Sequence, residues 1–448
     1  MAIRIIKTDR PLTAPEVIAF RDTWHSQKIT HGGIPRGVKL RELVQKTIDD
    51  VKKRGDARVI QDTRKLHGVV LRPRQLRLRQ AEIERAHREY TKEHGAFLRL
   101  IRRTISNVRR YQKSILAKTP RPLRRGGRKL SVRYTPIERV GVYVPGGRAA
   151  YPSSVIMTVV PAQVAGVREI AMLSPPQADG TIRPMVLAVA WELGLKEIYR
   201  ASGVAGLAAM AFGTRSIRRV DKIVGPGSAY MAEAKRQLFG RVGIDGITGP
   251  SEVLIIADGT ARADWLAADM LAQAEHDPGK ALLVTTSDKL AGAVAAEIER
   301  QLPKLKRAKA AGWAIDEHSG ISAIVVVPSI DKACDVANDF APEHLQIVTA
   351  NDEAVLGKVR NAGAIFVGAF TPVPLGDYYA GPSHVLPTDG TAKFSGALSC
   401  NDFLKATSVI RYDDKSFAQD AADVIDFASR EGLTAHAESV RIRLERKK

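Results

Sequence analysis

Residues 253–286 read VLIIADGTARADWLAADMLAQAEHDPGKALLVTT, and this stretch predicts the fold class. Two apolar runs of strand length, at 253–257 and 281–286, enclose a stretch near 262–275 with the apolar spacing of a helix. Strands that alternate with helices form parallel sheets covered on both faces. The stretch therefore predicts an α/β fold with a parallel sheet.

The same alternation continues on both sides of this stretch. A helix near 289–305 and strands at 322–327, 345–349 and 364–367 follow it. An earlier series has strands at 140–144, 169–173, 197–201 and 222–224, with helices at 152–166, 182–194, 204–213 and 228–240. Pro161 is expected to kink or divide the first of these helices. Two series predict two doubly wound, incomplete Rossmann-like domains.

The two ends of the chain have a different pattern. Residues 1–140 are mainly helical in character, and Gln80–Lys118 has helical periodicity that Pro120 stops. Turn-rich residues follow at 124–127. The stretch Asp420–Lys448 predicts a helix, a break at Gly432 and a second helix. We therefore expect helical N- and C-terminal segments beside the two sheets.

Composition excludes several classes of protein. The 448 residues are 44% hydrophobic, as is typical of a globular protein, and no apolar run reaches the roughly 18 residues of a membrane span. The N-terminus breaks at Asp9 and Pro11 before a signal-peptide core forms. Two cysteines give no disulfide framework. These features predict a cytoplasmic protein that does not enter a membrane.

The positive charge is concentrated in one part of the chain. The formal net charge is +21, and residues 51–140 hold 27 basic and 7 acidic side chains. Such a block can bind a polyanion such as nucleic acid. Its apolar helical spacing and its lack of interleaved aromatic residues favour a solvated helical surface instead. We therefore do not expect nucleic acid as a partner.

Glycine- and proline-rich turns stand at several predicted strand ends, at 144–147, 225–228 and 249–251. In open parallel sheets, ligands bind beyond the carboxyl ends of the strands. None of these turns is a GxGxxG fingerprint or a Walker loop. The turns indicate an enzyme that acts on a small molecule, and they do not identify a cofactor.

Several potential metal ligands stand near element ends. Gln273 and His276 are three residues apart near a helix end, so both side chains can point the same way. Asp377 lies in a Pro/Gly-rich loop seven residues before His384. These donors suit zinc, manganese or a similar ion. A single histidine is more often a hydrogen-bonding residue than a ligand, so the spacing leaves both interpretations open.

Glu343 and His344 follow Pro342, and the turn presents two titratable groups together. Histidine exchanges protons near neutral pH, and an adjacent glutamate can orient water or hold a second proton. The alternative is an exposed polar turn before the strand at 345–349.

Eight ordered motifs together resemble the histidinol dehydrogenase family over nearly the whole chain. They are GDARVIQDTRKL, RYTPIERVGVYVPGG, DKIVGPGSAYMAEAKRQ, GPSEVLIIAD, QAEHDP, APEHLQ, GDYYAGPSHVLPT and EGLTAHAESVRIRLE. The resemblance implies oxidation of L-histidinol through L-histidinal to L-histidine, the last step of histidine biosynthesis. It also implies two NAD-dependent steps and one zinc ion per subunit.

The resemblance also assigns roles to residues. The implied zinc ligands are Gln273, His276, Asp377 and His436. The implied acid/base pair is Glu343 and His344. The implied substrate contacts are Ser251, Gln273, His276, His344, Asp377, His384, Glu431 and His436. An intertwined homodimer is expected, in which the C-terminal segment brings Glu431 and His436 to the partner's site.

The expected domains follow the same resemblance. Residues 1–40 would form an N-terminal helical segment, and 397–448 a C-terminal segment in the dimer. Residues 41–141 and 251–396 would form a discontinuous α/β domain with the metal and acid/base groups. Residues 142–250 would bind NAD.

The chain departs from the family pattern at the positions expected to contact NAD. Those positions are Tyr143, Ala205 and Ser228, and only the tyrosine matches the family. Glutamine is usual where Ala205 stands, and asparagine is usual where Ser228 stands. The loss of two amides predicts an unusually high Michaelis constant for NAD.

Two other functions remain as alternatives. A paralogue that oxidises another small alcohol, such as a diol or a sulfonated diol, would share the zinc motifs. A protein of a different class would use the basic segment 51–140 to bind a polyanion. The zinc motifs do not distinguish the paralogue, but the tail EGLTAHAESVRIRLE and the loop GPSHVLPT resemble the histidinol enzymes more closely. The survival of every matched metal and acid/base position argues against a purely non-enzymatic protein.

Overall fold

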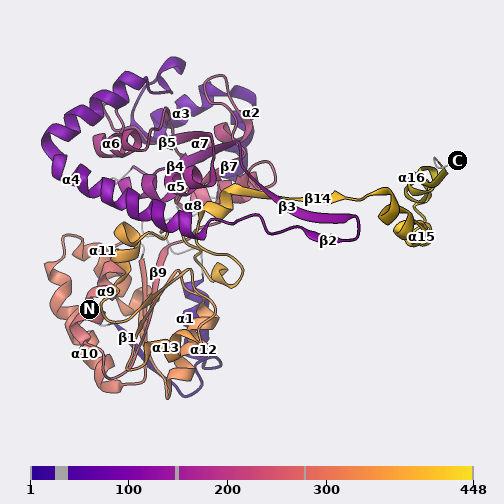
Figure 1. Cartoon of the computed structure of the whole chain (residues 1–448). Helices are drawn as coiled ribbons and strands as arrows, with labels where there is room; N and C mark the ends of the chain where they lie inside the picture. Colours follow the sequence, from indigo (N-terminus) through magenta and orange to yellow (C-terminus); the bar gives the residue numbers. More distant parts are fainter. Residues whose placement is uncertain (1–2, 26–38, 147–150, 277–278, 446–448) are drawn as a thin grey trace. The chain divides into compact units, whose positions relative to one another are not determined.

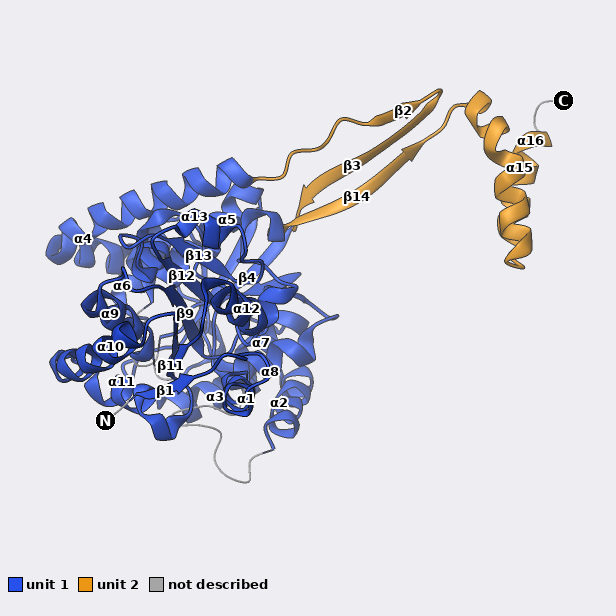
Figure 2. Ribbon diagram, turned by 90° about the horizontal axis from the view of Figure 1, so that it is seen from below, with its two compact units in different colours: residues 1–115, 138–402 blue, residues 116–137, 403–448 orange. Residues whose placement is uncertain are grey.

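The computed structural model describes residues 3–25, 39–146, 151–276 and 279–445. The chain forms two compact units, coloured separately in Figure 2. Unit 1 comprises Met1–Ile115 and Glu138–Asp402, and unit 2 comprises Leu116–Ile137 and Phe403–Lys448. None of the described helices is both long enough and apolar enough to cross a membrane.

Unit 1 contains a six-stranded sheet in the order β1-β11-β10-β9-β12-β13, and its neighbours all pair in parallel. Strands β1 and β9 of this sheet are labelled in Figure 1. The strands are β1 (Arg4–Lys7), β9 (Ser251–Ala257), β10 (Gly279–Thr285), β11 (Ala323–Val326), β12 (His344–Val348) and β13 (Ala364–Val367). The central strands are buried along almost their whole length. The predicted parallel sheet is therefore confirmed, with the addition of the short edge strand β1.

Helices cover both faces of this sheet. Val253 and Ile255 of β9 face the core shared with α9 (Ala263–Ala274), α10 (Asp288–Gln301) and α11 (Ala308–Ile315). Leu254 and Ile256 face the core shared with α1 (Pro15–Trp24), α12 (Ile330–Phe340) and α13 (Asp352–Leu356). Side chains alternate between the faces of a strand, which explains why β9 has to be apolar throughout.

A second parallel sheet of unit 1 has the order β6-β5-β4-β7-β8. Its strands are β4 (Arg139–Tyr143), β5 (Glu169–Ser174), β6 (Glu197–Arg200), β7 (Lys222–Val224) and β8 (Gly243–Ile244). The helices between them are α5 (Pro152–Ala165), α6 (Pro184–Glu192), α7 (Gly203–Phe212) and α8 (Ala229–Leu238). Pro161 lies inside α5, which remains one helix.

Three N-terminal helices pack on the second sheet, not on the first. They are α2 (Leu40–Arg54), α3 (Asp56–His67) and α4 (Gln80–Ile115). Val44, Ile48 and Val59 join the core that contains α7 and α8. Helix α4 contacts α5 and α6. This corrects our assignment of 41–141 to the domain of 251–396, because the apolar faces of these helices are buried against the helices of the other sheet. The segment 1–40 is also not purely helical, since it supplies β1.

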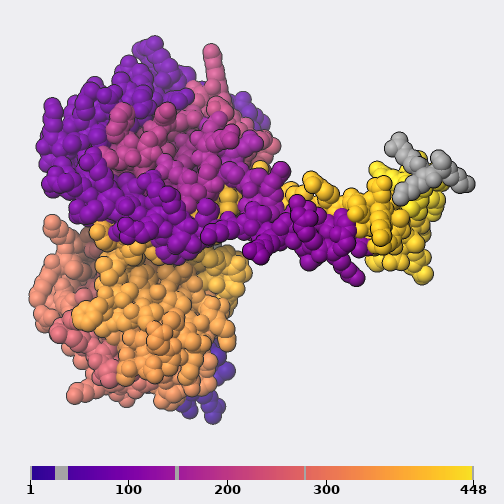
Figure 3. All heavy atoms as spheres, in the orientation of Figure 1, coloured from indigo at the N-terminus to yellow at the C-terminus, as the bar shows by residue number. Residues whose placement is uncertain are grey.

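Unit 2 contains a three-stranded antiparallel sheet in the order β14-β3-β2 and two helices. The elements are β2 (Leu123–Arg125), β3 (Arg128–Pro136), β14 (Leu404–Arg411), α15 (Asp414–Arg430) and α16 (Thr434–Glu445). The predicted turn at 124–127 is the hairpin between β2 and β3. The predicted break at Gly432 is confirmed, and α15 and α16, yellow in Figure 3, pack against each other. Of the expected segment 397–448, residues 403–448 thus share unit 2 with residues 116–137, and residues 397–402 belong to unit 1.

Candidate active site

The candidate catalytic residues lie at the amino edge of the six-stranded sheet. Ser251 is the first residue of β9, and His344 is the first residue of β12. Paired registers place β9 directly beside β12, so these strand starts are neighbours. We expected ligands beyond the carboxyl ends of strands, but the turn at 249–251 leads into the amino end of β9. Residues 245–250 connect β8 of the second sheet to β9. The site therefore lies where the chain passes from one sheet to the other.

Glu343 is held by two hydrogen bonds to one carboxylate oxygen. Ser251 Oγ donates to Glu343 Oε2 over 2.7 Å, and the backbone N–H of Glu252 donates to the same oxygen over 2.8 Å. Burial raises the pKa of Glu343, although His344 and the two donors oppose this effect. A buried carboxylate with fixed donors and a raised pKa is suited to proton transfer.

His344 is oriented by both of its ring nitrogens. Nδ1 lies 2.8 Å from the backbone oxygen of Glu252 and donates its hydrogen there. Nε2 is buried, lies 3.4 Å from Oδ1 of Asp377, and has no hydrogen-bond partner among the residues that the structure describes. Burial lowers the pKa of this imidazole, but the carboxylates of Glu343 and Asp377 outweigh burial and raise the pKa to about 9. Nε2 is therefore the nitrogen available to a substrate.

Two candidate metal ligands of unit 1 lie close to Glu343 and His344, since Gln273 contacts Ser251 and Asp377 faces His344. Gln273, near the end of α9, is buried, and its amide nitrogen donates to Ser251 Oγ, which leaves Oε1 as the atom able to face a cation. His276 lies in the turn after α9. Protein atoms around its ring lower its pKa by desolvation, and the nearby carboxylate of Asp377 opposes this shift. The neutral imidazole is the form that binds a metal.

Asp377 and His384 lie in the loop after β13. Asp377 belongs to the short π-helix Gly376–Ala380, which follows α14 (Val373–Leu375). Burial raises its pKa, but the neighbouring imidazoles, His344 first among them, outweigh burial and lower the pKa. His384 Nδ1 donates to the backbone oxygen of Asp377 over 3.0 Å. The second nitrogen of His384 is then an acceptor, as a substrate contact or a ligand requires.

Glu431 and His436 belong to unit 2. Glu431 caps the C-terminal end of α15, His436 lies in the first turn of α16, and both are exposed. Among the residues that the structure describes, no group of three or more His, Cys, Asp or Glu side chains is arranged as ready metal ligands. In unit 1 the implied donors are one imidazole, one carboxylate and one amide oxygen. Donors of these three kinds suit a zinc-class ion.

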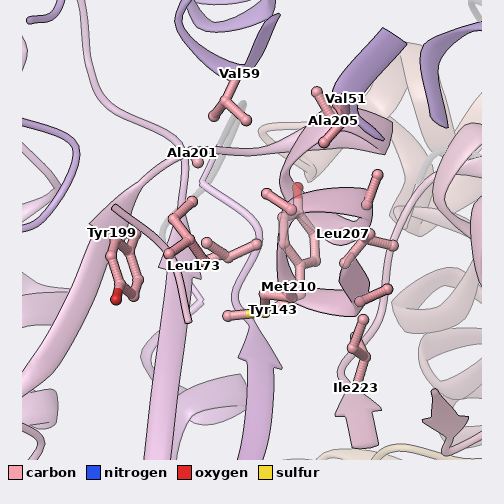
Figure 4. Close-up of a cluster of buried hydrophobic side chains, with 14 of the residues drawn as sticks. Val51, Val59, Tyr143, Leu173, Tyr199, Ala201, Ala205, Leu207, Met210 and Ile223 are labelled. Carbon is pink, nitrogen blue, oxygen red and sulfur yellow. The ribbon is translucent and has the colours of Figure 1, made fainter. Parts of the chain in front are cut away.

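The three expected NAD contacts differ in accessibility. Tyr143, at the end of β4, and Ala205, in α7, lie in one buried apolar cluster (Figure 4). Burial raises the pKa of Tyr143 to about 12, so its phenol is neutral at physiological pH. Ser228 begins α8, is exposed, and does not cap the helix with its hydroxyl. Of the three, only Ser228 presents a polar side chain at the surface.

Glu252 is a functional residue that sequence analysis missed. Its backbone binds the side chains of Glu343 and His344, and its carboxylate accepts from Nζ of Lys280 over 3.0 Å. Lys280 also pairs with Asp389 over 2.7 Å, and all three charges are buried. The sequence did contain a signal, because Glu252 and Lys280 each stand within an otherwise apolar strand. A buried charge needs a partner of opposite charge, so the two could have been paired.

Comparison with known proteins identifies relatives in the histidinol dehydrogenase family. The profile of the histidinol dehydrogenase family matches residues 36–444. The histidinol dehydrogenase of Geobacillus kaustophilus (strain HTA426) is 48% identical over 407 residues, which cover 91% of this chain and 94% of the relative. That of Bacillus subtilis (strain 168) is 44% identical over 407 residues, which cover 91% and 93%.

A solved structure agrees with the sequence matches. The crystal structure of histidinol dehydrogenase from Elizabethkingia anophelis has a TM-score of 0.89 and 31% identity, and the match covers 99% of this chain and 98% of that one. Sequence and fold thus agree, and the chain belongs to the histidinol dehydrogenase family.

Proposed function

We propose that this chain oxidises L-histidinol to L-histidine through L-histidinal, in two hydride transfers to NAD, as the last step of histidine biosynthesis. The observation that carries the proposal is the arrangement of Glu343 and His344. Both side chains are held by the backbone of Glu252. His344 faces the candidate zinc ligand Asp377, and Ser251 links Glu343 to the candidate ligand Gln273.

In the first oxidation, His344 accepts the hydroxyl proton of the substrate at Nε2. Its Nδ1–H is engaged by Glu252, so the ring keeps one orientation. In this structure the carboxylates of Glu343 and Asp377 raise the pKa of His344 to about 9. With Asp377 bound to a cation, Glu343 alone would still raise that pKa, and His344 would be a neutral base over a wider pH range.

In the second oxidation, water has to add to the aldehyde before another hydride can leave. Glu343 is the group that removes a proton from this water, because its carboxylate is buried and fixed by Ser251 and Glu252. The first oxidation consumes no water. Glu343 therefore acts mainly in the second step.

Gln273, His276, Asp377 and His436 would hold one zinc ion per subunit. When bound, zinc supplies a Lewis acid that fixes the substrate and stabilises negative charge on its oxygen. Ser251, His384 and Glu431 would add contacts to the substrate. These residues orient the alcohol carbon so that its hydride can reach the nicotinamide of NAD.

We propose an intertwined homodimer, in which unit 2 of one subunit completes the site of the other. The support is the composition of unit 2, which exposes large apolar side chains. Phe427 is 67% exposed and Ile442 is 55% exposed. Exposed apolar surface of this kind marks a protein interface. Light scattering on purified protein tests this, because a monomer at micromolar concentration would contradict it.

The experiment that tests the activity is NAD reduction by zinc-loaded protein. L-Histidinol is offered first, and diols, sulfonated diols and amino alcohols serve as controls. We expect activity with L-histidinol. Reduction with a diol alone would assign the chain to the paralogous alcohol dehydrogenases instead. A cytoplasmic location agrees with a biosynthetic role.

A further inference from the structure

A buried ion pair lies beneath the loop that joins β7 to α8. Lys235 of α8 and Asp245, which follows β8, are 2.6 Å apart between Nζ and Oδ1. Each side chain is only 2% exposed. Neither residue takes part in the proposed chemistry. Taking two charges out of water is costly, so a buried pair needs a local reason for its presence.

The pair binds both backbone groups of Gly225, its N–H and its carbonyl oxygen. Lys235 Nζ donates to the backbone oxygen of Gly225 over 2.6 Å. The backbone N–H of Gly225 donates to Asp245 Oδ2 over 2.7 Å. The other oxygen of Asp245 accepts from the N–H of Gly246 over 2.9 Å. The hydrogen-bonding groups on either side of the Gly225 α-carbon are therefore fixed by charged partners, which make stronger hydrogen bonds than neutral ones.

Gly225 is also fixed against the neighbouring strand. Its φ is +121°, and a Cβ there would lie 2.2 Å from the backbone oxygen of Tyr143. Only glycine tolerates both conditions. The loop 225–228 thus starts from a rigid contact with the end of β4, and it leads to Ser228 and the first turn of α8.

This loop lies where a parallel sheet binds its ligand, at the carboxyl end of β7 and the start of a helix. The side chains available there are few, since Ala205 is buried and Ser228 is short. Contacts to a dinucleotide would then come mainly from the backbone of the loop. Backbone contacts depend on the conformation of the loop before the ligand arrives.

We propose that Lys235 and Asp245 are positioning residues for the cofactor loop 225–228, and that this chain binds NAD through a backbone held in place by that pair. The inference rests on the proposed function, which requires NAD. It deepens that function by assigning cofactor affinity to two residues that do not touch the cofactor themselves.

The test is calorimetric titration of NAD into wild-type protein and into Lys235→Met and Asp245→Asn. We expect each variant to bind NAD about 10- to 100-fold more weakly, as for loss of a hydrogen bond to a charged group. Zinc content and the Michaelis constant for L-histidinol should remain within about twofold, since the contacts of the pair are with the backbone of Gly225 and Gly246. Lys235→Arg should restore part of the affinity, because it keeps the charge.

Arg139→Met is the matched control. Arg139 begins β4, at the opposite end from Tyr143, and it pairs with Glu169 and Glu197 while almost fully buried. Its loss removes a buried cation from the same sheet, so thermal stability should fall while NAD affinity remains unchanged. Equal weakening of NAD binding in this control would show a general effect of destabilisation and would overturn the inference.

Hydrogen exchange provides a second measurement. In Asp245→Asn, at least one of the amides of residues 225 and 246 should exchange faster than in wild type, because the two N–H groups donate to different carboxylate oxygens and asparagine keeps only one acceptor oxygen. Folded variants that bind NAD within twofold of wild type would overturn the inference and leave the proposed function intact. Wild type that binds NAD but does not oxidise L-histidinol would contradict the proposed function instead, because calorimetry does not depend on turnover.

Discussion

His344 and Asp377 face each other across 3.4 Å, from Nε2 of the imidazole to Oδ1 of the carboxylate. This contact joins the acid/base pair to the candidate metal ligands. The opposite nitrogen of the ring is already engaged by the backbone of Glu252. The imidazole of His344 is therefore held by the backbone of Glu252 at Nδ1 and faces the candidate metal ligand Asp377 at Nε2.

Removal of a metal ligand should remove both metal and turnover. The ligands come from distant segments, so binding requires the folded site. We expect Asp377→Ala and His276→Ala to lose zinc, measured by elemental analysis, together with activity. Chelation of the wild type should have the same effect, and added zinc should reverse it. Full activity in metal-free wild-type protein would contradict the site.

Loss of the proposed base should separate chemistry from metal binding. His344→Ala should lower kcat by about 10²–10⁴-fold, the usual effect of a positioned acid/base group. Zinc content should remain at the wild-type value, since His344 is not a proposed ligand. Rapid-quench kinetics measures the loss of turnover, and elemental analysis measures the zinc content. A variant that loses its zinc would make His344 a ligand instead of a base.

Glu343→Gln should slow the second oxidation more than the first. The amide keeps the shape of the carboxylate but cannot accept a proton from water. L-Histidinal offered as substrate isolates the second step, and L-histidinol in single turnover isolates the first. Ser251→Ala serves as the comparison, because it removes one donor to Glu343 and keeps the carboxylate. An unchanged rate with L-histidinal would remove this role from Glu343.

The two positions that depart from the family should respond differently to reversion. Ser228 is exposed, so Ser228→Asn adds an amide at the surface and should lower the Michaelis constant for NAD several-fold. Ala205 is 0% exposed in a packed core, so Ala205→Gln should lower the free energy of unfolding by about 1–3 kcal/mol through overpacking. Denaturant unfolding and initial rates measure both effects. If Ala205→Gln were as stable as wild type and bound NAD more tightly, position 205 would be accessible to the cofactor, contrary to its burial in the structure.

Much of the fold was predictable from apolar runs, and the exceptions have physical causes. Strands β9 and β10 are buried on both faces, so their sequences are continuously apolar and easy to recognise. Strand β14 is mostly exposed, and its sequence LKATSVIR gave no such signal. Strand β1 has four residues and lies at an edge, where little burial is required. The placement of α2 on the second sheet depends on tertiary contacts that helical periodicity does not specify.

The candidate site was predictable as a set of residues and not as a geometry. Motifs identified Glu343, His344 and Asp377, and the structure brings these three together. Their position at the amino edge of a sheet was not expected, because the general rule places ligands at carboxyl ends. Glu252 and Lys280 were missed because their charges lie within apolar strands, where only the structure reveals their partners.

The zinc-dependent, two-step oxidation of L-histidinol that we propose fixes the ratio of NADH formed to L-histidinol consumed. Zinc-loaded wild-type protein is given limiting L-histidinol and excess NAD, and the products are separated by chromatography. We expect two NADH and one L-histidine for each L-histidinol, with no product after chelation. One NADH with accumulated L-histidinal, or no NADH at all, would contradict it.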